Sequence, residues 1–153
     1  MNSNELLPQQ GRNFSAVQTG PAHELGRYSF NHPRLPRSAK GKIFLKDLVG
    51  LTGMEVSLNR LPAGKGMPFL HVHQKNEELY IFTGGRGQFQ VDGEIIPIEP
   101  GTVIRVSPDG ARAWKNSSTE DLYFVCIQAR AGTMAGSTIE DGLPITKPFT
   151  WPE

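Results

Sequence analysis

The sequence predicts an all-β domain, built as a sandwich or barrel of short antiparallel strands. Its 153 residues include 17 glycines and 12 prolines, and no long stretch has the 3.6-residue periodicity of a helix. About eight or nine short runs of β-forming residues are instead separated by turn signals every 8–12 residues, which is typical of sandwiches and barrels. A chain of this length is expected to form one domain with its own core.

An N-terminal arm is predicted to precede the strands. Residues 1–40 lack a core pattern and are broken by prolines, so we expect them to be extended or partly disordered unless they dock. Six basic and no acidic residues lie between positions 27 and 46: Arg27, Arg34, Arg37, Lys40, Lys42 and Lys46. Such a run favours either a solvated arm or a segment that docks onto an acidic surface, for example on a second subunit.

Residues 41–131 are expected to form the barrel. Its predicted strands cover 42–45, 53–61, 69–73, 78–83, 88–91, 94–98, 102–106, 112–116 and 122–128. Asp92-Gly93 predicts a type I′ hairpin turn, and Pro97 places the returning strand at an edge or near its own end. Residues 132–153 are irregular, and the aromatic Phe149 and Trp151 are expected to pack this tail onto the barrel.

The charge and hydropathy of the chain argue against several classes of partner. The formal net charge is +1, so no overall field favours nucleic acid or an anionic membrane. No apolar run approaches the roughly 18 residues of a membrane span, and we find no secretory signal. The single cysteine, Cys126, fits a reducing compartment. We therefore expect a cytoplasmic protein that acts on a small molecule.

His71, His73 and Glu78 are the candidate metal ligands. Two histidines at i and i+2 on a strand project from the same face, about 6.6 Å apart along the backbone. Their imidazoles can lean onto one ion, and a carboxylate from the next strand supplies a third ligand. Two neutral imidazoles and one carboxylate suit one borderline divalent ion, such as Zn, Fe, Mn, Ni or Cu.

This pattern resembles the first motif of the cupins, small β-barrels of the RmlC-like jelly-roll type. That motif reads Gly, His-x-His, three or four residues, Glu, six residues, Gly. Its places are held by His71, His73, Glu78 and Gly85. Gly64 and Gly66 both miss the usual spacing of the first glycine. The resemblance spans about residues 50–130 and implies a jelly-roll barrel of two packed antiparallel sheets. Its spacing favours Glu78 over Glu77 as the ligand, so we expect Glu77 to face solvent.

The second cupin motif is matched less closely, and the departure affects the metal site. The motif reads Gly, five residues, Pro-x-Gly, two residues, His, three residues, Asn. Its places are held by Gly101, Ser107, Asp109, Arg112 and Asn116. The family's fourth metal ligand therefore falls at Arg112, which is always protonated and cannot bind a cation. With metal, the site is a three-ligand face with open positions for water or substrate. Without metal, Arg112 is expected to pair with Glu78 beside a plain binding pocket.

Four polar residues are candidates for substrate contacts: Arg112, Tyr80, Asn59 and Gln128. Arg112 is interpreted either as a bidentate clamp for a phosphate or carboxylate or as an exposed or ion-paired residue beside Trp114. Tyr80 shares strand parity with Glu78, and the two amides are polar positions within predicted strands. The catalytic candidates are Glu78, Tyr80 and Arg112, whereas Cys126 is expected to be a small core residue.

The resemblance leaves three functions open, because one fold hosts many activities. The first is a metal-dependent isomerase of a small polyol or sugar phosphate, with Arg112 holding the phosphate. The second is an iron-dependent dioxygenase, and the third is a non-catalytic cupin that binds a small ligand. Cupins commonly exchange N-terminal strands between subunits, so the long arm suits a homodimer.

Overall fold

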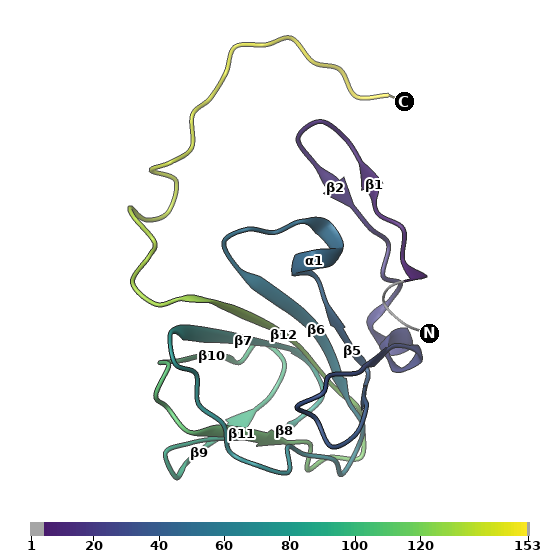
Figure 1. Cartoon of the computed structure of the whole chain (residues 1–153), viewed down its shortest axis with the longest axis vertical. Coiled ribbons are helices and arrows are strands. Elements are labelled where there is room, and N and C mark those ends of the chain that lie inside the picture. Colours follow the sequence, from purple (N-terminus) through teal and green to yellow (C-terminus); the bar gives the residue numbers. More distant parts are fainter. Residues whose placement is uncertain (1–4, 153) are drawn as a thin grey trace.

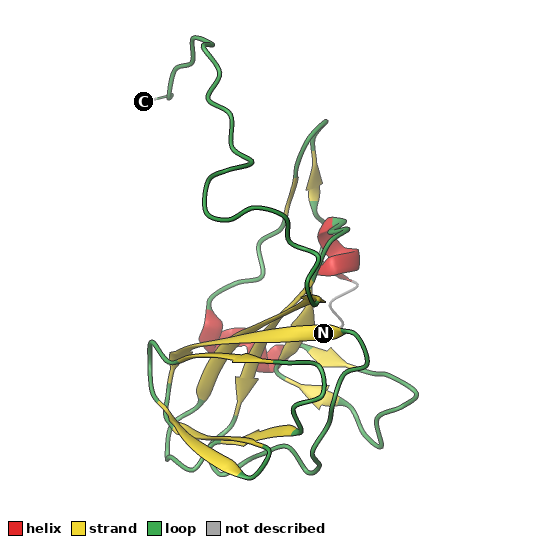
Figure 2. Ribbon diagram, turned by 90° about the vertical axis from the view of Figure 1, so that its left-hand side faces the viewer, coloured by secondary structure: helices red, strands yellow, loops and turns green. Residues whose placement is uncertain are grey.

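The chain folds into two antiparallel sheets that pack face to face around the core (Figures 1 and 2). The computed structural model describes residues 5–152; residues 1–4 and 153, at the ends of the expected arm and tail, lie outside this range. The larger sheet has the strand order β10-β7-β12-β6-β5, and the smaller sheet has the order β11-β8-β9. The predicted all-β architecture of two packed antiparallel sheets is confirmed.

The strand boundaries follow the predicted ladder closely after residue 75. The larger sheet contains β5 (Lys42–Phe44), β6 (Glu55–Leu61), β7 (Asn76–Gly84), β10 (Val103–Val106) and β12 (Leu122–Arg130). The smaller sheet contains β8 (Gly87–Val91), β9 (Glu94–Ile98) and β11 (Arg112–Lys115). Two short strand pairs precede them: β1 (Gln9–Gln10) with β2 (Ser15–Ala16), and β3 (Ser29–Phe30) with β4 (Ala39–Lys40).

Short helices accompany the strands: within the described part of the chain, a 3₁₀ helix covers Ala22–Arg27 and α1 covers Lys46–Val49. Neither was expected from the sequence, because both are too short to show a helical period. Across residues 5–152, no helix has the length and apolar character needed to cross a membrane.

The predicted hairpin between β8 and β9 is confirmed by its backbone angles. Asp92 and Gly93 have φ values of 50° and 88°, and positive φ at both central residues defines a type I′ turn. Pro97 lies in β9, at the edge of the smaller sheet, where its missing N–H leaves no ladder partner unsatisfied.

The prediction of a strand over residues 69–73 is wrong. This segment forms only an isolated antiparallel bridge between His71 and Arg112, although the two backbone N–H to carbonyl bonds of that bridge are well formed, at 3.1 and 3.0 Å. The His73 N–H donates to the Pro108 carbonyl at 2.8 Å instead of continuing the pairing. The segment therefore lies against the edge strand β11 and turns away after one bridge.

The interior faces of β7, β12 and β6 carry matched residues. Tyr80 pairs with Cys126, and Cys126 pairs with Ser57, so alternate residues of all three strands point into the core. The buried cluster there is rich in aromatic rings: Tyr80, Phe82, Phe89, Trp114 and Phe124. These rings fill the space between the sheets and leave the polar residues at one end of it.

The arm and the tail behave differently. Leu25 and Tyr28 of the arm are buried together with Ile43 against the outer face of the larger sheet, so this part of the arm is docked. The tail instead runs away from the sheets (Figure 1), and Phe149 and Trp151 are 75% and 83% exposed. Their rings contact each other, with centroids 5.8 Å apart, and the expected packing of the tail on the barrel is not seen.

Candidate metal site

The structure brings His71, His73 and Glu78 together at one end of the interior. Each offers one ligand atom, and these atoms all lie within 4.8 Å of one another. His71 Nε2 lies 3.7 Å from Glu78 Oε2, and His73 Nε2 lies 3.1 Å from Glu78 Oε1. The Glu78 side chain is 5% exposed, whereas those of the histidines are 24% and 23% exposed, so the cluster is open on the histidine side.

The donor atoms fit a divalent ion. Bonds of about 2.1 Å to one ion place neighbouring ligand atoms roughly 3.0–3.4 Å apart. The His73–Glu78 separation of 3.1 Å lies in this range, and the His71–Glu78 separation of 3.7 Å is somewhat longer. His71 Nδ1 and His73 Nε2 are buried and have no hydrogen-bond partner within the described residues. Buried polar nitrogens are normally satisfied, and for His73 an ion bound between the imidazole and the carboxylate would supply the missing partner.

The protonation states also suit a ligand set. Burial lowers the pKa of His73, aided by the charge of Arg112, and this effect outweighs the opposing pull of Glu78. Burial by itself would raise the pKa of Glu78, but contacts with His71 and Tyr80 and the charge of Arg112 lower it to about 2. At neutral pH the site therefore contains a neutral His73 imidazole and a carboxylate, as metal binding requires.

Glu78 is separated in space from the neighbouring carboxylate. The Glu77 carboxylate pairs with Arg105 at 2.6 Å on the other face of β7, where the two side chains are 36% and 56% exposed. Glu77 therefore lies away from the cluster. Strand alternation accounts for the difference between these consecutive residues.

Arg112 is fully buried, and its donors are directed at backbone carbonyls. Nη1 donates to Gly110 at 2.8 Å and to Pro108 at 3.2 Å, and a longer bond from Nη2 reaches Ser107 at 3.4 Å. Nε lies 3.2 Å from Glu78 Oε2. The guanidinium thus ties the turn before β11 to the ligand carboxylate. This geometry matches the ion-paired interpretation of Arg112 and leaves its Nη groups turned toward the turn.

The two oxygens of Glu78 have different surroundings. Oε2 accepts a short hydrogen bond from the Tyr80 hydroxyl and faces Arg112. Oε1 faces His73 and, at 3.5 Å, the thiol of Cys126. Partners that hold one oxygen of a ligating carboxylate orient the other toward the ion, so the Arg112 pair and a metal on Oε1 are compatible.

Tyr80 and Cys126 are both buried and both stay protonated. Burial raises the pKa of the Tyr80 phenol far above its usual value, and the nearby Glu78 carboxylate acts in the same direction. Burial and Glu78 likewise raise the pKa of the Cys126 thiol to about 12. Neither group is an anion at neutral pH, so each is a hydrogen-bond donor to Glu78.

The two predicted amide contacts are engaged within the protein. The Asn59 amide donates to the Ser57 carbonyl at 2.9 Å and to the Ser57 hydroxyl at 3.0 Å. The Gln128 side-chain oxygen accepts from Asn76 at 3.0 Å. Both amides lie on the interior face of their strands, and their role as substrate contacts stays a prediction.

Lys42 is an interior residue that sequence reasoning assigned to the basic arm. It lies on β5 opposite Asn59, and Phe44 lies opposite Ser57, so both side chains share the interior face of β6. Alternation along the strand could have indicated this. Ile43 is buried on the outer face, under the arm, so its neighbours Lys42 and Phe44 point to the interior face.

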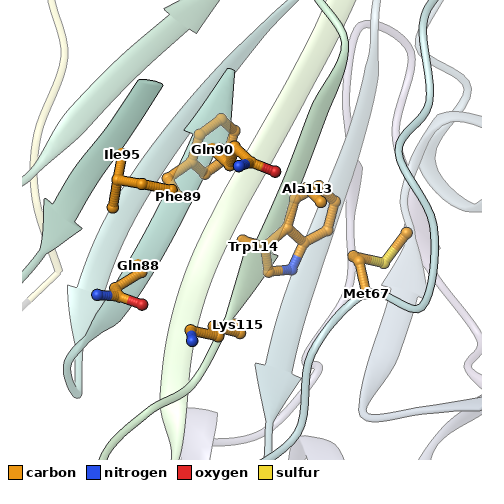
Figure 3. Close-up of a pocket in the computed structure, with 8 residues that line it drawn as sticks. All are labelled: Met67, Gln88, Phe89, Gln90, Ile95, Ala113, Trp114 and Lys115. Atoms are coloured by element: carbon orange, nitrogen blue, oxygen red, sulfur yellow. The ribbon is translucent and has the colours of Figure 1, made fainter. Parts of the chain in front are cut away.

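A separate pocket of about 250 Å³ lies over the smaller sheet (Figure 3). It is lined by Met67, Gln88, Phe89, Gln90, Ile95, Ala113, Trp114 and Lys115. None of these is a metal ligand of the cluster. Trp114 is shared, since its ring also packs against His71 with centroids 5.9 Å apart.

Comparison with known proteins agrees with this geometry. The family profile described as "Cupin domain" matches residues 57–128. A cupin protein from Bacteroides fragilis is 40% identical, with a TM-score of 0.66 over 76% of this chain and 98% of that chain. An oxalate-binding protein from Thermotoga maritima is 26% identical over 96 residues, which is 60% of this chain and 78% of that protein.

A proposed sugar phosphate isomerase from Acidithiobacillus ferrooxidans is 29% identical, with a TM-score of 0.54 over 58% of each chain. The two packed sheets, the His-x-His segment and the near-complete coverage of the Bacteroides protein agree with one another. The chain belongs to the cupin family.

Proposed function

We propose that the protein binds one divalent metal ion through His71, His73 and Glu78 and acts on a small, oxygen-rich anionic substrate there. The observation that carries the proposal is the convergence of three ligand atoms within 4.8 Å, with His73 Nε2 buried, 3.1 Å from Glu78 Oε1 and without a hydrogen bond. Zn, Fe, Mn and Ni all suit this ligand set. A bound ion would polarise substrate oxygens as a Lewis acid.

The surrounding residues have distinct roles in this proposal. Arg112 and Tyr80 hold Glu78 Oε2 and so position the carboxylate. His71 and His73 leave the ligand face open, because about a quarter of each side chain is exposed. With only three protein ligands, coordination positions remain for substrate oxygens, as in catalytic rather than structural sites.

The comparisons support a small substrate with closely spaced oxygens. One relative is an oxalate-binding protein, and one similar structure is a proposed sugar phosphate isomerase. Oxalate and sugar phosphates both carry anionic oxygens that can chelate a divalent ion. We propose a cytoplasmic homodimer. The free, buried Cys126 supports the location, and the exposed apolar side chains of the tail, including Trp151, support assembly.

Metal analysis of protein purified without added metal tests the proposal. We expect close to one ion per chain, and His73→Ala should lose it, whereas the control His32→Ala in the arm should retain it. A wild-type content below about 0.1 ion per chain, even after refilling with each candidate metal, would refute the proposal. Iron together with oxygen uptake would favour the dioxygenase, and zinc, manganese or nickel would favour the isomerase.

A further inference from the structure

Lys42 points a positive charge into the same interior as the ligand cluster. β5 is the edge strand of the larger sheet, and its register places Lys42 opposite Asn59. Asn59 in turn pairs with the buried Phe124 of β12. On the other face of β5, Ile43 is fully buried against Leu25 and Tyr28 of the arm. The docked arm therefore fixes which way Lys42 faces.

Among the residues that the structure describes, the Lys42 ammonium has no counter-ion in contact. Its Nζ lies 4.8 Å from the centroid of the Phe44 ring, and within residues 5–152 it makes no hydrogen bond or ion pair. Two other cations of this region are paired: Lys46 contacts Asp47 at 3.0 Å, and Arg60 contacts Asp121 at 2.6 Å. A partly buried ammonium without a partner is unfavourable, so its position requires an explanation.

Acidic groups face Lys42 but are committed elsewhere. Burial lowers the pKa of Lys42, while Cys126, Glu78 and Glu55 act in the opposite direction. Both oxygens of Glu78 have closer partners, as described above. One oxygen of Glu55 accepts the backbone N–H groups of Lys46 and Val56 at 2.9 and 3.0 Å. The negative charges of Glu78 and Glu55 thus favour the protonated form of Lys42 without contacting its ammonium.

We propose that Lys42 binds one carboxylate of a small dicarboxylate substrate whose other carboxylate is bound at the His71–His73–Glu78 site. The inference deepens the proposed function and rests on it. A dianion fits because the interior face carries two different groups: the ligand cluster, which suits metal coordination, and the lone ammonium of Lys42. An ammonium is a compact point charge with three donors, and it suits a carboxylate approached from one side. Lys42 is thus a specificity-determining residue supplied by the edge strand.

Isothermal titration calorimetry on the metal-loaded full chain tests this role. The probes are oxalate, malonate and succinate, each compared with its monoamide, which keeps one carboxylate and loses the second charge. We expect wild type to bind at least one dicarboxylate more tightly than its monoamide, by about 10- to 100-fold, the range of a hydrogen bond between charged groups. The comparison needs no variant, so it stands even where a substitution disturbs folding.

Two variants locate the preference. Lys42→Met should lose the dicarboxylate preference while monoamide binding and metal content stay unchanged, and Lys42→Arg should retain most of it. Lys40→Met, an exposed arm lysine two residues away, is the matched control and should behave as wild type. Equal binding of dicarboxylates and monoamides by wild type, or an undiminished preference in Lys42→Met, overturns the role of Lys42.

The outcomes separate this inference from the proposed function. A chain that holds stoichiometric metal but shows no preference refutes the role of Lys42 and leaves the metal site standing. A chain that holds no metal refutes both. A Lys42→Met variant that loses metal as well as dicarboxylate binding shows that Lys42 supports the cluster rather than the substrate, and this too overturns the inference.

Discussion

Replacing Arg112 by methionine should strongly destabilise the metal-free protein. The Arg112 side chain is fully buried, and its Nε lies 3.2 Å from the carboxylate of Glu78, which is 5% exposed. Methionine keeps most of the apolar stem but removes the charge and every donor. The Glu78 carboxylate is then left buried with only its contacts to Tyr80, Cys126 and the histidines. The Gly110 carbonyl loses its Arg112 donor, whereas the Pro108 carbonyl keeps the His73 N–H.

The magnitude follows from the burial of the pair. Removing one partner of a buried ion pair costs about 3–5 kcal/mol, because the other charge stays in a medium of low polarity. The free energy of unfolding of a domain is about 5–15 kcal/mol, so this is a large fraction of it. For a chain of this length, the loss corresponds to a decrease in Tm of roughly 6–20 °C.

Thermal and urea unfolding, followed by circular dichroism in the presence of a chelator, measures this effect. The matched control is Arg105→Met, which removes the exposed ion pair to Glu77. That pair is shorter than the buried one, at 2.6 Å against 3.2 Å, yet its loss should cost no more than about 1 kcal/mol. Adding a divalent ion should raise the Tm of the Arg112 variant more than that of wild type, because the ion replaces the lost charge beside Glu78. A stability loss equal to that of the Arg105 control would refute the reasoning.

Three further predictions concern the same cluster. The pKa of Glu78 is lowered from 4.5 to about 2, so it adds about 3 kcal/mol of stability above pH 4.5, which is lost as the pH falls toward 2. In the metal-free Glu78→Gln variant, the free energy of unfolding should therefore decrease less as the pH falls, whereas Glu77→Gln should behave as wild type. Identical acid-unfolding profiles of the two variants would contradict the assignment of Glu78. Arg112→His exchanges a cation for the ligand that cupins usually have, and should tighten metal binding at least about 10-fold; competition with a chelator measures it, and an unchanged affinity would count against a shared site. Tyr80→Phe removes the donor to Glu78 Oε2 and should weaken metal binding about 10- to 100-fold, and metal affinity equal to that of wild type would show that the hydroxyl does not position the carboxylate.

Much of the fold was predictable because its signals are local. Alternation of apolar and polar residues placed β7, β8 and β12 close to their observed bounds, and Asp92-Gly93 predicted the hairpin between β8 and β9 from turn chemistry alone. Part of the ligand cluster was predictable for the same reason, because the parity of β7 directs Glu78, but not Glu77, inward. His71 and His73 also reach the cluster, but from a segment that forms a single bridge rather than the expected strand.

The errors fall where pairing partners lie far apart in the sequence. The 69–73 segment has the composition of a strand, but its single bridge to Arg112 depends on where β11 ends. The tail was expected to pack through Phe149 and Trp151, yet a pair of aromatic residues does not specify a surface for them. The arm was expected to dock only conditionally, and the burial of Leu25 and Tyr28 depends on the outer face of β5 and β6.

Local spacing therefore suffices to specify the strands after residue 75, the hairpin and the inward direction of Glu78, because a period of two residues requires no knowledge of distant partners. Only the tertiary structure reveals that Arg112 holds Glu78 Oε2 and that Lys42 faces the same interior. The position of Lys42 results from three successive registers, β5 on β6, β6 on β12 and β12 on β7. A shift of one residue in any of them would reverse the face to which a side chain points, and long-range pairing alone sets those registers.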